Sequence, residues 1–295
     1  MIPSPRQVQE LLDQHGLRPS KALGQNFVTD ANTVRRIARL AELDPSSRVL
    51  EIGAGLGSLT VALAETGAAV TALEVDAKLV PLLRERVEPL GVRVVQGDAL
   101  TLDFGPLLAA GDGETDSDGD GVSSSDRGGR TWTLVANLPY NVAVPIVVRV
   151  LDEVPPVQAM LVMVQREVGL RLAASPGDKT YGAVSVKVAY HATARVVGRV
   201  PAAVFVPRPK VESVLVHIAR RPVVAVDPDV VPADRLFEVV RAGFAHRRKM
   251  LRRALVGVVS GGAFAAAGID PQARAENLSI EEWGRLAAWQ EGPRA

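Results

Sequence analysis

Residues 137–140 combine an amide, a proline and an aromatic ring at the point where a buried stretch of the chain ends. The apolar and β-branched run 132–136 predicts a strand, and Asn137 with Pro139 predicts a turn after it. Such a turn could hold an amino group attached to an aromatic ring. The side-chain oxygen of Asn137 and the backbone carbonyl of Leu138 or Pro139 could each accept one N–H, while Tyr140 could stack on the ring. The alternative is an ordinary β-turn whose Tyr140 fills the core.

Three glycines, Gly53, Gly55 and Gly57, lie between a predicted strand and a predicted helix. Glycine has no Cβ, so the backbone can adopt positive φ and approach a ligand closely. A dinucleotide-binding loop has the spacing G-x-G-x-x-G, which would require glycine at the position of Ser58. The spacing G-x-G-x-G, preceded by Glu51, instead fits the cofactor loop of Rossmann-like S-adenosylmethionine methyltransferases. A tight turn alone would not need three glycines in five residues.

Two acidic residues end the next two predicted strands. Glu74 could accept both hydroxyl groups of a ribose, and Asp98 could accept from the amino group of an adenine ring. Either acid could instead cap a helix, and Asp76 is a further candidate for such a cap. Together with the glycine loop, these acids predict an adenosyl cofactor lying across the carboxyl ends of the strands.

Short apolar stretches alternate with helix-forming stretches, which is typical of an α/β fold with a doubly wound parallel sheet. We therefore expect a Rossmann-like class I S-adenosylmethionine methyltransferase domain over residues 1–221 and a small helical domain over residues 222–295, joined by a proline-containing linker. Thr29 or Asp30 could cap the second helix. The predicted strands are 48–53, 69–76, 92–100, 131–137, 158–165, 181–200 and 212–220, and the predicted helices include 5–16, 31–43, 58–67 and 77–91.

A polar insertion over residues 111–129 interrupts this alternation and predicts a flexible loop. Its Asp116, Asp118 and Asp120 match the start of a calcium-binding loop, but Arg127 stands where that loop needs Glu. We therefore expect no metal site.

The composition excludes several classes of mechanism. The 295 residues include no cysteine, which rules out disulfides, thiolate zinc sites and a cysteine nucleophile. No apolar run is long enough to cross a membrane and no secretory signal is present, so we expect a cytoplasmic protein. The net charge is only +1, but residues 205–256 carry eleven Lys or Arg against five Asp or Glu.

Most of this local charge lies in residues 246–253, which we call the basic segment. Its sequence HRRKMLRR predicts a helix. The segment could bind the phosphates of a nucleic acid or could be only the solvated face of an amphipathic helix. The candidate phosphate-binding residues are Arg247, Arg248, Lys249, Arg252 and Arg253.

A set of motifs, in order along the chain, resembles the bacterial small-subunit rRNA adenine dimethyltransferases. The resemblance implies S-adenosylmethionine-dependent dimethylation of N6 on two adjacent adenosines in a hairpin near the 3′ end of 16S rRNA, late in small-subunit assembly. It also implies a monomer that acts on the immature small subunit. The motifs are KALGQNF (21–27), EIGAGLGSLT (51–60), LEVD (73–76), GDAL (97–100), NLPYNV (137–142), VQREV (164–168), YGAVSV (181–186), FVPRPKVESVLV (205–216), FAHRRKMLRRAL (244–255) and AENLS (275–279).

The resemblance also assigns roles to single residues. Asn26, the backbone of Val28 and Gly53 would border the methionine end of the cofactor. The remaining roles are Gly55 in the cofactor loop, Glu74 at the ribose, Asp98 at the adenine, Asn137 and Pro139 at the target amine, and Tyr140 and Phe205 on the two faces of the target base. The chain departs from the family pattern in the length of the 111–129 insertion and in Arg208, which stands where proline is common.

Two alternatives remain from the sequence. An Erm-type enzyme, which methylates large-subunit rRNA, shares the glycine loop and the Asn137 turn. A mainly non-catalytic assembly factor would bind immature small subunits without methylating them. The basic C-terminal part and the AENLS motif favour the small-subunit dimethyltransferase over the Erm-type enzyme, and the intact cofactor and amine-acceptor residues argue against the non-catalytic factor.

Overall fold

The computed structural model describes residues 2–20, 22–109 and 131–289. The chain forms two compact units. Unit 1 comprises Met1–Gly169 and Val196–Ile218, and unit 2 comprises Leu170–Arg195 and Ala219–Ala295. The sequence predicted a single domain boundary between residues 221 and 222. The observed units differ from this prediction, because residues 170–195 and 219–221 belong to the same unit as the C-terminal part. The 111–129 insertion, with its candidate calcium loop, lies outside the described residues.

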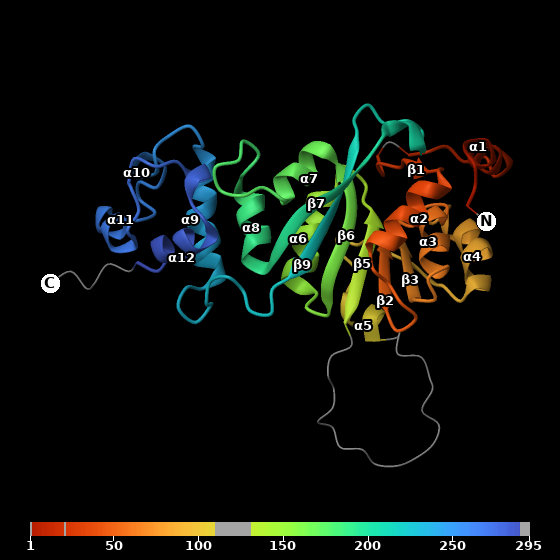
Figure 1. The fold of residues 1–295 in the computed structure, drawn as a ribbon, viewed down its shortest axis with the longest axis horizontal. Coiled ribbons are helices and arrows are strands. Elements are labelled where there is room, and N and C mark those ends of the chain that lie inside the picture. Colours follow the sequence, from red (N-terminus) through yellow and green to blue (C-terminus); the bar gives the residue numbers. More distant parts are fainter. Residues whose placement is uncertain (1, 21, 110–130, 290–295) are drawn as a thin grey trace, which may run out of the picture. The chain divides into compact units, whose positions relative to one another are not determined.

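A seven-stranded sheet is the centre of the fold, with strand order β4-β3-β2-β5-β6-β9-β7 (Figure 1). The first five strands in this order pair in parallel, which confirms the predicted α/β class. The seven strands of the sheet are β2 Arg48–Ile52, β3 Ala69–Glu74, β4 Arg93–Gln96, β5 Trp132–Asn137, β6 Val157–Gln165, β7 Ala192–Val200 and β9 Ser213–Arg220. A separate antiparallel pair joins β1 Phe27–Val28 to β8 Phe205–Val206.

Helices connect the strands of this sheet. Asp30 begins the second helix, where its side chain accepts a hydrogen bond from the backbone N–H of Thr33 at 2.7 Å, as expected of an N-cap. The helices are α1 Pro5–Gln14, α2 Ala31–Leu40, α3 Ser58–Ala64, α4 Val80–Val87, α5 Phe104–Ala109, α6 Ala143–Glu153 and α7 Arg166–Leu172, with 3-10 turns η1 Glu88–Leu90 and η2 Ala202–Val204. None of the helices in the described residues is long and apolar enough to span a bilayer.

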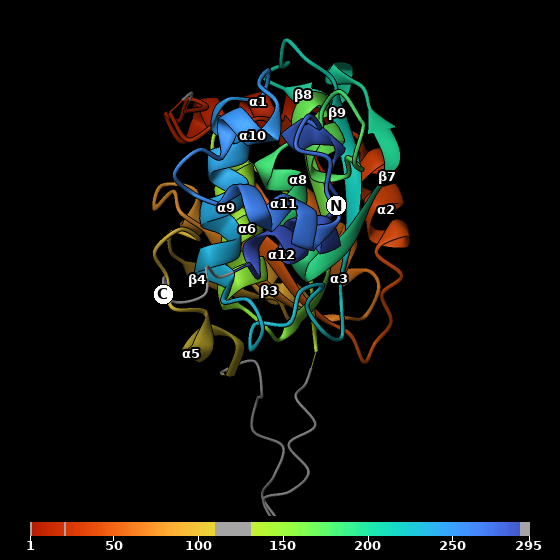
Figure 2. The same cartoon turned by 90° about the vertical axis from the view of Figure 1, so that its left-hand side faces the viewer.

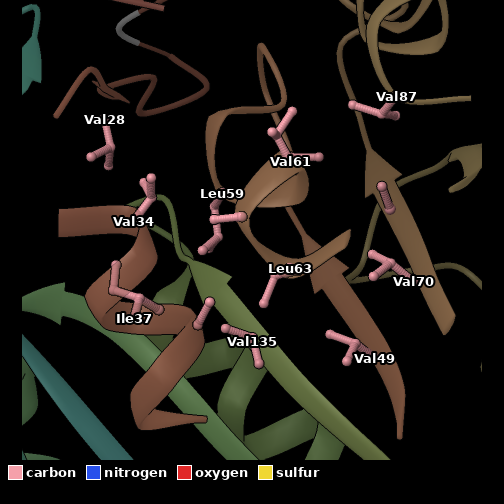
Figure 3. Packing of buried hydrophobic residues seen from close by; sticks show 14 of the residues in the cluster. Val28, Val34, Ile37, Val49, Leu59, Val61, Leu63, Val70, Val87 and Val135 are labelled. Carbon is pink, nitrogen blue, oxygen red and sulfur yellow. The ribbon is translucent and has the colours of Figure 1, made fainter. Parts of the chain in front are cut away.

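The core of unit 1 lies between the sheet and helices α2, α3 and α4. Val49, Val70 and Val135 of neighbouring strands pack against Ile37 of α2 and Leu63 of α3 (Figure 3). Residues that alternate with these along the strands, such as Leu50 and Leu134, are equally buried, so the sheet is covered on both faces.

The strand register brings the candidate ligand-binding residues to one edge. Ile52 pairs with Leu73, and Glu74 pairs with Gln96, so β2, β3 and β4 end close together. Asn137 is the last residue of β5, which adjoins β2. The carboxyl ends of parallel strands are where open α/β sheets bind their ligands.

Unit 2 is mainly helical, and α9, α11 and α12 pack together within it (Figures 1 and 2). Its core includes Tyr181, Tyr190 and Trp283. The helices are α8 Ala183–His191, α9 Ala233–Ala245, α10 Leu251–Ala254, α11 Gly261–Ala267 and α12 Ile280–Ala287, with the 3-10 turn η3 Ala275–Asn277.

Two secondary-structure predictions are wrong here. The strand predicted over residues 181–200 is helix α8 followed by strand β7. The basic segment is not one helix, because α9 ends at Ala245 and only the single turn α10 follows. The backbone N–H groups of Leu251 and Arg252 donate to the carbonyls of Ala273 and Pro271, a tertiary interaction that the local sequence does not encode.

Candidate active site

A pocket opens at the carboxyl edge of the sheet in unit 1. It is lined by the loop before β1, the glycine loop after β2, the end of β3 and the turn after β5. Most of the predicted site therefore lies together. The predicted residues that line the pocket are Asn26, Val28, Gly53, Gly55, Glu74, Asn137, Pro139 and Tyr140.

The glycine loop has the conformation expected of a close backbone approach. Gly53, Gly55 and Gly57 all have positive φ, at 75°, 58° and 78°. A Cβ on Gly55 would lie 3.1 Å from the ring of Phe27, which is a tight contact, and the φ of +58° would strain any other residue. The backbone of the loop thus forms one wall of the pocket without side chains in the way.

Glu74 lies at the end of β3 and is 4% exposed. Its Oε2 accepts the N–H of Gly55 at 2.7 Å, and its Oε1 accepts the N–H of Asp76 at 2.9 Å. Burial raises the pKa of this carboxyl above its ordinary value, the two backbone donors oppose that effect, and the charge of Asp76 adds to it. Each carboxylate oxygen can accept a second hydrogen bond, so the fixed carboxylate can still receive ribose hydroxyls.

A second buried carboxyl, Glu51, has no predicted role of its own beyond preceding the glycine loop. It is 1% exposed on β2 and lines the pocket. Burial raises its pKa to about 8, and the nearby charge of Glu74 adds to the rise. Within the described part of the chain, Glu51 Oε2, Ser58 Oγ and Thr60 Oγ1 are buried without a hydrogen-bond partner. Glu51 and Ser58 both line the pocket, and such orphaned polar atoms are what a polar ligand would satisfy.

Asn137 is held in one orientation by the loop before β1. Its Nδ2 donates to the backbone carbonyl of Asn26 at 3.0 Å. This bond uses the donor end of the amide and leaves Oδ1 as the acceptor end. The side chain can therefore receive an N–H from a substrate amine.

The two backbone carbonyls considered as the second acceptor differ in their surroundings. The carbonyl of Pro139 accepts the N–H of Val142 at 3.1 Å, which closes the turn. Leu138 lines the pocket, and its own N–H donates to the carbonyl of Met163 at 3.1 Å. The Pro139 carbonyl serves the turn but can still accept a second N–H, so the carbonyls of Leu138 and Pro139 both stay candidates for the second acceptor.

The ring of Tyr140 is fixed by an interaction that sequence reasoning missed. Its hydroxyl lies 2.8 Å from Oγ of Ser213, a buried residue at the start of β9. Burial raises the pKa of the Tyr140 hydroxyl, while the Ser213 hydrogen bond lowers it by less. The only signal for Ser213 is a polar residue that opens an apolar strand, and nothing local identifies its partner.

A second cavity lies next to the first and shares Gly24, Gln25, Asn26 and Tyr140 with it. Its other wall is the loop after β8, which carries Arg208 and Lys210. Both cations are exposed, and neither forms an ion pair with a described residue. The two cavities therefore meet at residues 24–26 and Tyr140.

Two predicted residues do not line these cavities. Phe205 is 2% exposed and belongs to the hydrophobic core, where β8 pairs with β1 and sets Phe205 opposite Val28. Packing has thus buried the ring, and the role of Phe205 on the second face of the target base stays a prediction. Asp98 follows β4 and is exposed beside the edge, and its Oδ1 accepts the N–H of Leu100 at 2.8 Å.

The residues of the basic segment belong to unit 2. Arg247 pairs with Glu276 at 2.8 Å and also donates to the carbonyl of Lys179, so it has a structural role. Arg248, Lys249, Arg252 and Arg253 are exposed and form no ion pair with described residues. Among the residues that the structure describes, no cluster of potential metal ligands is present.

Comparison with known proteins finds rRNA methyltransferases. The chain is 43% identical to "Ribosomal RNA small subunit methyltransferase A" of Pelotomaculum thermopropionicum, over 97% of this chain and 96% of that protein. It is 44% identical to the protein of the same name from Cutibacterium acnes, over 96% of this chain and 92% of that one. Among solved structures, the 23S rRNA methyltransferase ErmE is 26% identical with a TM-score of 0.67, covering 89% of this chain and 98% of that one.

The family comparison covers nearly the whole molecule. Residues 16–291 match the family described as "Ribosomal RNA adenine dimethylase". This range includes the glycine loop, the Asn137 turn and the basic segment. A match of this extent, together with relatives above 40% identity, confirms the resemblance inferred from the motifs. The chain belongs to the ribosomal RNA adenine dimethylase family.

Proposed function

We propose that this protein dimethylates N6 of two adjacent adenosines in a hairpin near the 3′ end of small-subunit rRNA, using S-adenosylmethionine, late in subunit assembly. The observation that carries the proposal is the fixed amide of Asn137. Its donor end is bound to Asn26, and its acceptor end is left for an amine beside the glycine loop. The small-subunit methyltransferases at 43–44% identity support the choice of RNA.

The residues of the first cavity fit an adenosyl cofactor. Glu74 is positioned for the ribose hydroxyls, and the exposed Asp98 at the next strand end is available for the adenine amino group. The unpartnered Glu51 Oε2 and Ser58 Oγ can receive polar atoms of the cofactor's amino-acid end. When bound, S-adenosylmethionine supplies an electrophilic methyl group on a sulfonium that is already a good leaving group.

The turn after β5 would prepare the target nitrogen for attack. Asn137 Oδ1 accepts one N–H of the adenine amino group, and the carbonyl of Leu138 or Pro139 accepts the other. These two bonds draw the nitrogen towards pyramidal geometry and direct its lone pair at the methyl group. Positioning is the main task of the protein here, so no strong general base is needed.

Tyr140 would hold the base once it has left its stack. An adenine inside a hairpin must be extruded before its amino group can be reached. The ring of Tyr140 borders both cavities and is fixed by Ser213, so it offers a preorganised stacking surface. The exposed cations of the basic segment would bind rRNA phosphates.

The proposal also includes action as a monomer in the cytoplasm on immature small subunits, and these points remain predictions. The Erm-type alternative is supported by the ErmE structure, whose identity to this chain is lower than that of the small-subunit enzymes. The assembly-factor alternative would leave the acceptor end of the fixed Asn137 amide without a function.

The deciding experiment is a methyl-transfer assay on unmethylated small subunits, large subunits and naked RNA. The proposal predicts dimethyladenosine in small-subunit RNA only, located by mass spectrometry in a 3′ hairpin. Methylation of the large subunit would instead support the Erm-type function. Binding to small subunits without any methyl transfer would support the assembly factor.

A further inference from the structure

The segment 22–26 includes three residues that the two cavities share. Gly24, Gln25 and Asn26 line both the cofactor pocket and the neighbouring target cavity. We call residues 22–26 the shared wall. A ligand in either cavity would therefore contact the same stretch of the chain.

The shared wall is fastened to the turn after β5 by two side-chain amides. Asn137 Nδ2 donates to the carbonyl of Asn26 at 3.0 Å, and Asn141 Nδ2 donates to the carbonyl of Ala22 at 3.1 Å. These two bonds hold opposite ends of the wall. Asn141 thus repeats, four residues later in the turn, the hydrogen bond made by Asn137.

Close packing joins the wall and the turn between these two bonds. Gly24 has φ of +63°, and a Cβ there would lie 2.8 Å from Oδ1 of Asn141 and 3.1 Å from Cβ of Pro139. Both distances are shorter than an ordinary van der Waals contact. Only glycine therefore lets the wall lie this close to the turn, and the two amide bonds hold it there.

The other side of the wall is connected to the cofactor pocket. Gln25 Nε2 donates to Oδ2 of Asp76 at 2.8 Å, and the N–H of Asp76 donates to Glu74. The side chain of Gln25 is also held from the preceding residues, since its Oε1 accepts the backbone N–H of Ser20 at 2.7 Å. A continuous set of bonds therefore connects the turn, the wall and the carboxylate of Glu74.

We infer that Asn141 is a positioning residue, which holds the shared wall through the Ala22 carbonyl and so couples cofactor binding to target-nucleotide binding. Asn141 lines the target cavity and not the cofactor pocket. Its effect on the cofactor is therefore indirect, and the bond to Ala22 gives it a route through the wall. The names of the two ligands rest on the proposed function, whereas the mechanical link between the cavities does not.

The first test measures binding of S-adenosylhomocysteine to the RNA-free protein by calorimetry. Asn141→Ala removes one hydrogen bond from the wall and should weaken binding by about five-fold. Asn141→Asp, which has no N–H to donate to Ala22, should weaken it at least as much. Asn32→Ala, at an exposed asparagine of α2, is the matched control and should leave the affinity unchanged.

Gly24→Ala tests the same packing from the other side and remains informative if an Asn141 variant folds poorly. We expect it to weaken S-adenosylhomocysteine binding. Combined with Asn141→Ala, it should cost less than the sum of the two single changes, because the clash with Asn141 is then gone. Affinity within two-fold of the unchanged protein in Asn141→Ala, or strict additivity in the double variant, would overturn the inference.

The second test measures the coupling itself on unmethylated small subunits. S-adenosylhomocysteine should tighten subunit binding of the unchanged protein by about five-fold or more, and this factor should fall towards one in Asn141→Ala. Equal factors in the two proteins would overturn the inference. If no small subunit is bound or methylated at all, the proposed function fails, but the RNA-free affinities still decide the role of Asn141. A purely structural role would lower the melting temperature without changing the coupling factor.

Discussion

The turn at residues 137–141 and the basic segment at residues 246–253 use polar side chains in opposite ways. In the turn, Asn137, Tyr140 and Asn141 each have a hydrogen-bond partner on another part of unit 1. In the basic segment, only Arg247 is paired with a carboxylate among described residues, and the remaining cations are exposed. A reacting amine needs acceptors at fixed positions, whereas a polyanion can be bound by mobile charges. The difference predicts large, specific effects from the turn and small, additive effects from the basic segment.

The largest effect should come from Asn137→Ala. Loss of the side-chain acceptor removes a fixed hydrogen bond to the reacting nitrogen, so we expect kcat to fall by about 100- to 1,000-fold. The measurement is single-turnover methylation of unmethylated small subunits, with Asn32→Ala as the control. A kcat within five-fold of the unchanged enzyme would show that the turn does not act on the amine.

Glu51→Gln tests whether the carboxyl group of Glu51 is shielded from water in the folded protein, as its burial indicates. In the unfolded chain this carboxyl ionises near its ordinary pKa, whereas in the folded protein its pKa is about 8. The free energy of unfolding should therefore fall as the pH rises from about 4.5 to 8, by up to ~4 kcal/mol between pH 5 and pH 8. Glutamine cannot ionise, so the variant should lack this part of the pH dependence.

Chemical denaturation of the unchanged protein and Glu51→Gln across this pH range gives the comparison. The difference between the two curves isolates the contribution of Glu51 from that of other titrating groups. Parallel curves would mean that Glu51 is solvated and already ionised at neutral pH.

Two variants of Tyr140 distinguish the contribution of its ring from that of its hydroxyl group. Tyr140→Ala removes the ring and should lower kcat/KM for small subunits by about 10- to 100-fold, since base stacking on an aromatic side chain contributes ~1–3 kcal/mol. Tyr140→Phe keeps the ring and loses only the bond to Ser213, so its kcat/KM should stay within about three-fold. Equal losses in both variants would assign the function to the hydroxyl group instead.

The smallest effects should come from the basic segment. Replacing Arg248, Lys249, Arg252 and Arg253 together by Gln should weaken subunit binding about ten-fold at moderate salt. The slope of the logarithm of the binding constant against the logarithm of the salt concentration should also become shallower, by about 0.7–0.9 for each phosphate that is no longer neutralised. The kcat at saturating substrate should not change. Arg247→Gln is the internal control, because its guanidinium already pairs with Glu276, and its salt slope should stay near that of the unchanged protein. Unchanged slopes in the fourfold variant would remove the basic segment from the RNA interface.

The same two regions show what could be predicted before the structure was known. The glycine loop, Glu74 and Asn137 were all predicted to lie at one edge of the sheet, because strand order and period determine where parallel strands end. The basic segment was predicted as one helix and is not, since its backbone binds the loop at residues 271–273. Local sequence encodes a strand end but not a tertiary hydrogen bond.

Two further differences have similar causes. Residues 183–191 alternate valine with other residues and resemble a strand, yet they form α8, whose Val186 and Tyr190 pack into the core of unit 2. The pairing of β8 with β1 buries Phe205, which the local sequence does not show, and its contact with the target base stays a prediction. Apolar runs allow both strand and helix, and only packing between distant segments decides which forms.

The Asn137 turn is central to the proposed dimethylation of adenosines in small-subunit rRNA. The most direct test is mass spectrometry of rRNA from a strain lacking its own dimethylase and expressing either this protein or its Asn137→Ala variant. We predict two adjacent N6,N6-dimethyladenosines near the 3′ end of small-subunit rRNA with the unchanged protein and none with the variant. Full methylation by the variant, or dimethyladenosine in large-subunit rRNA, would contradict this function.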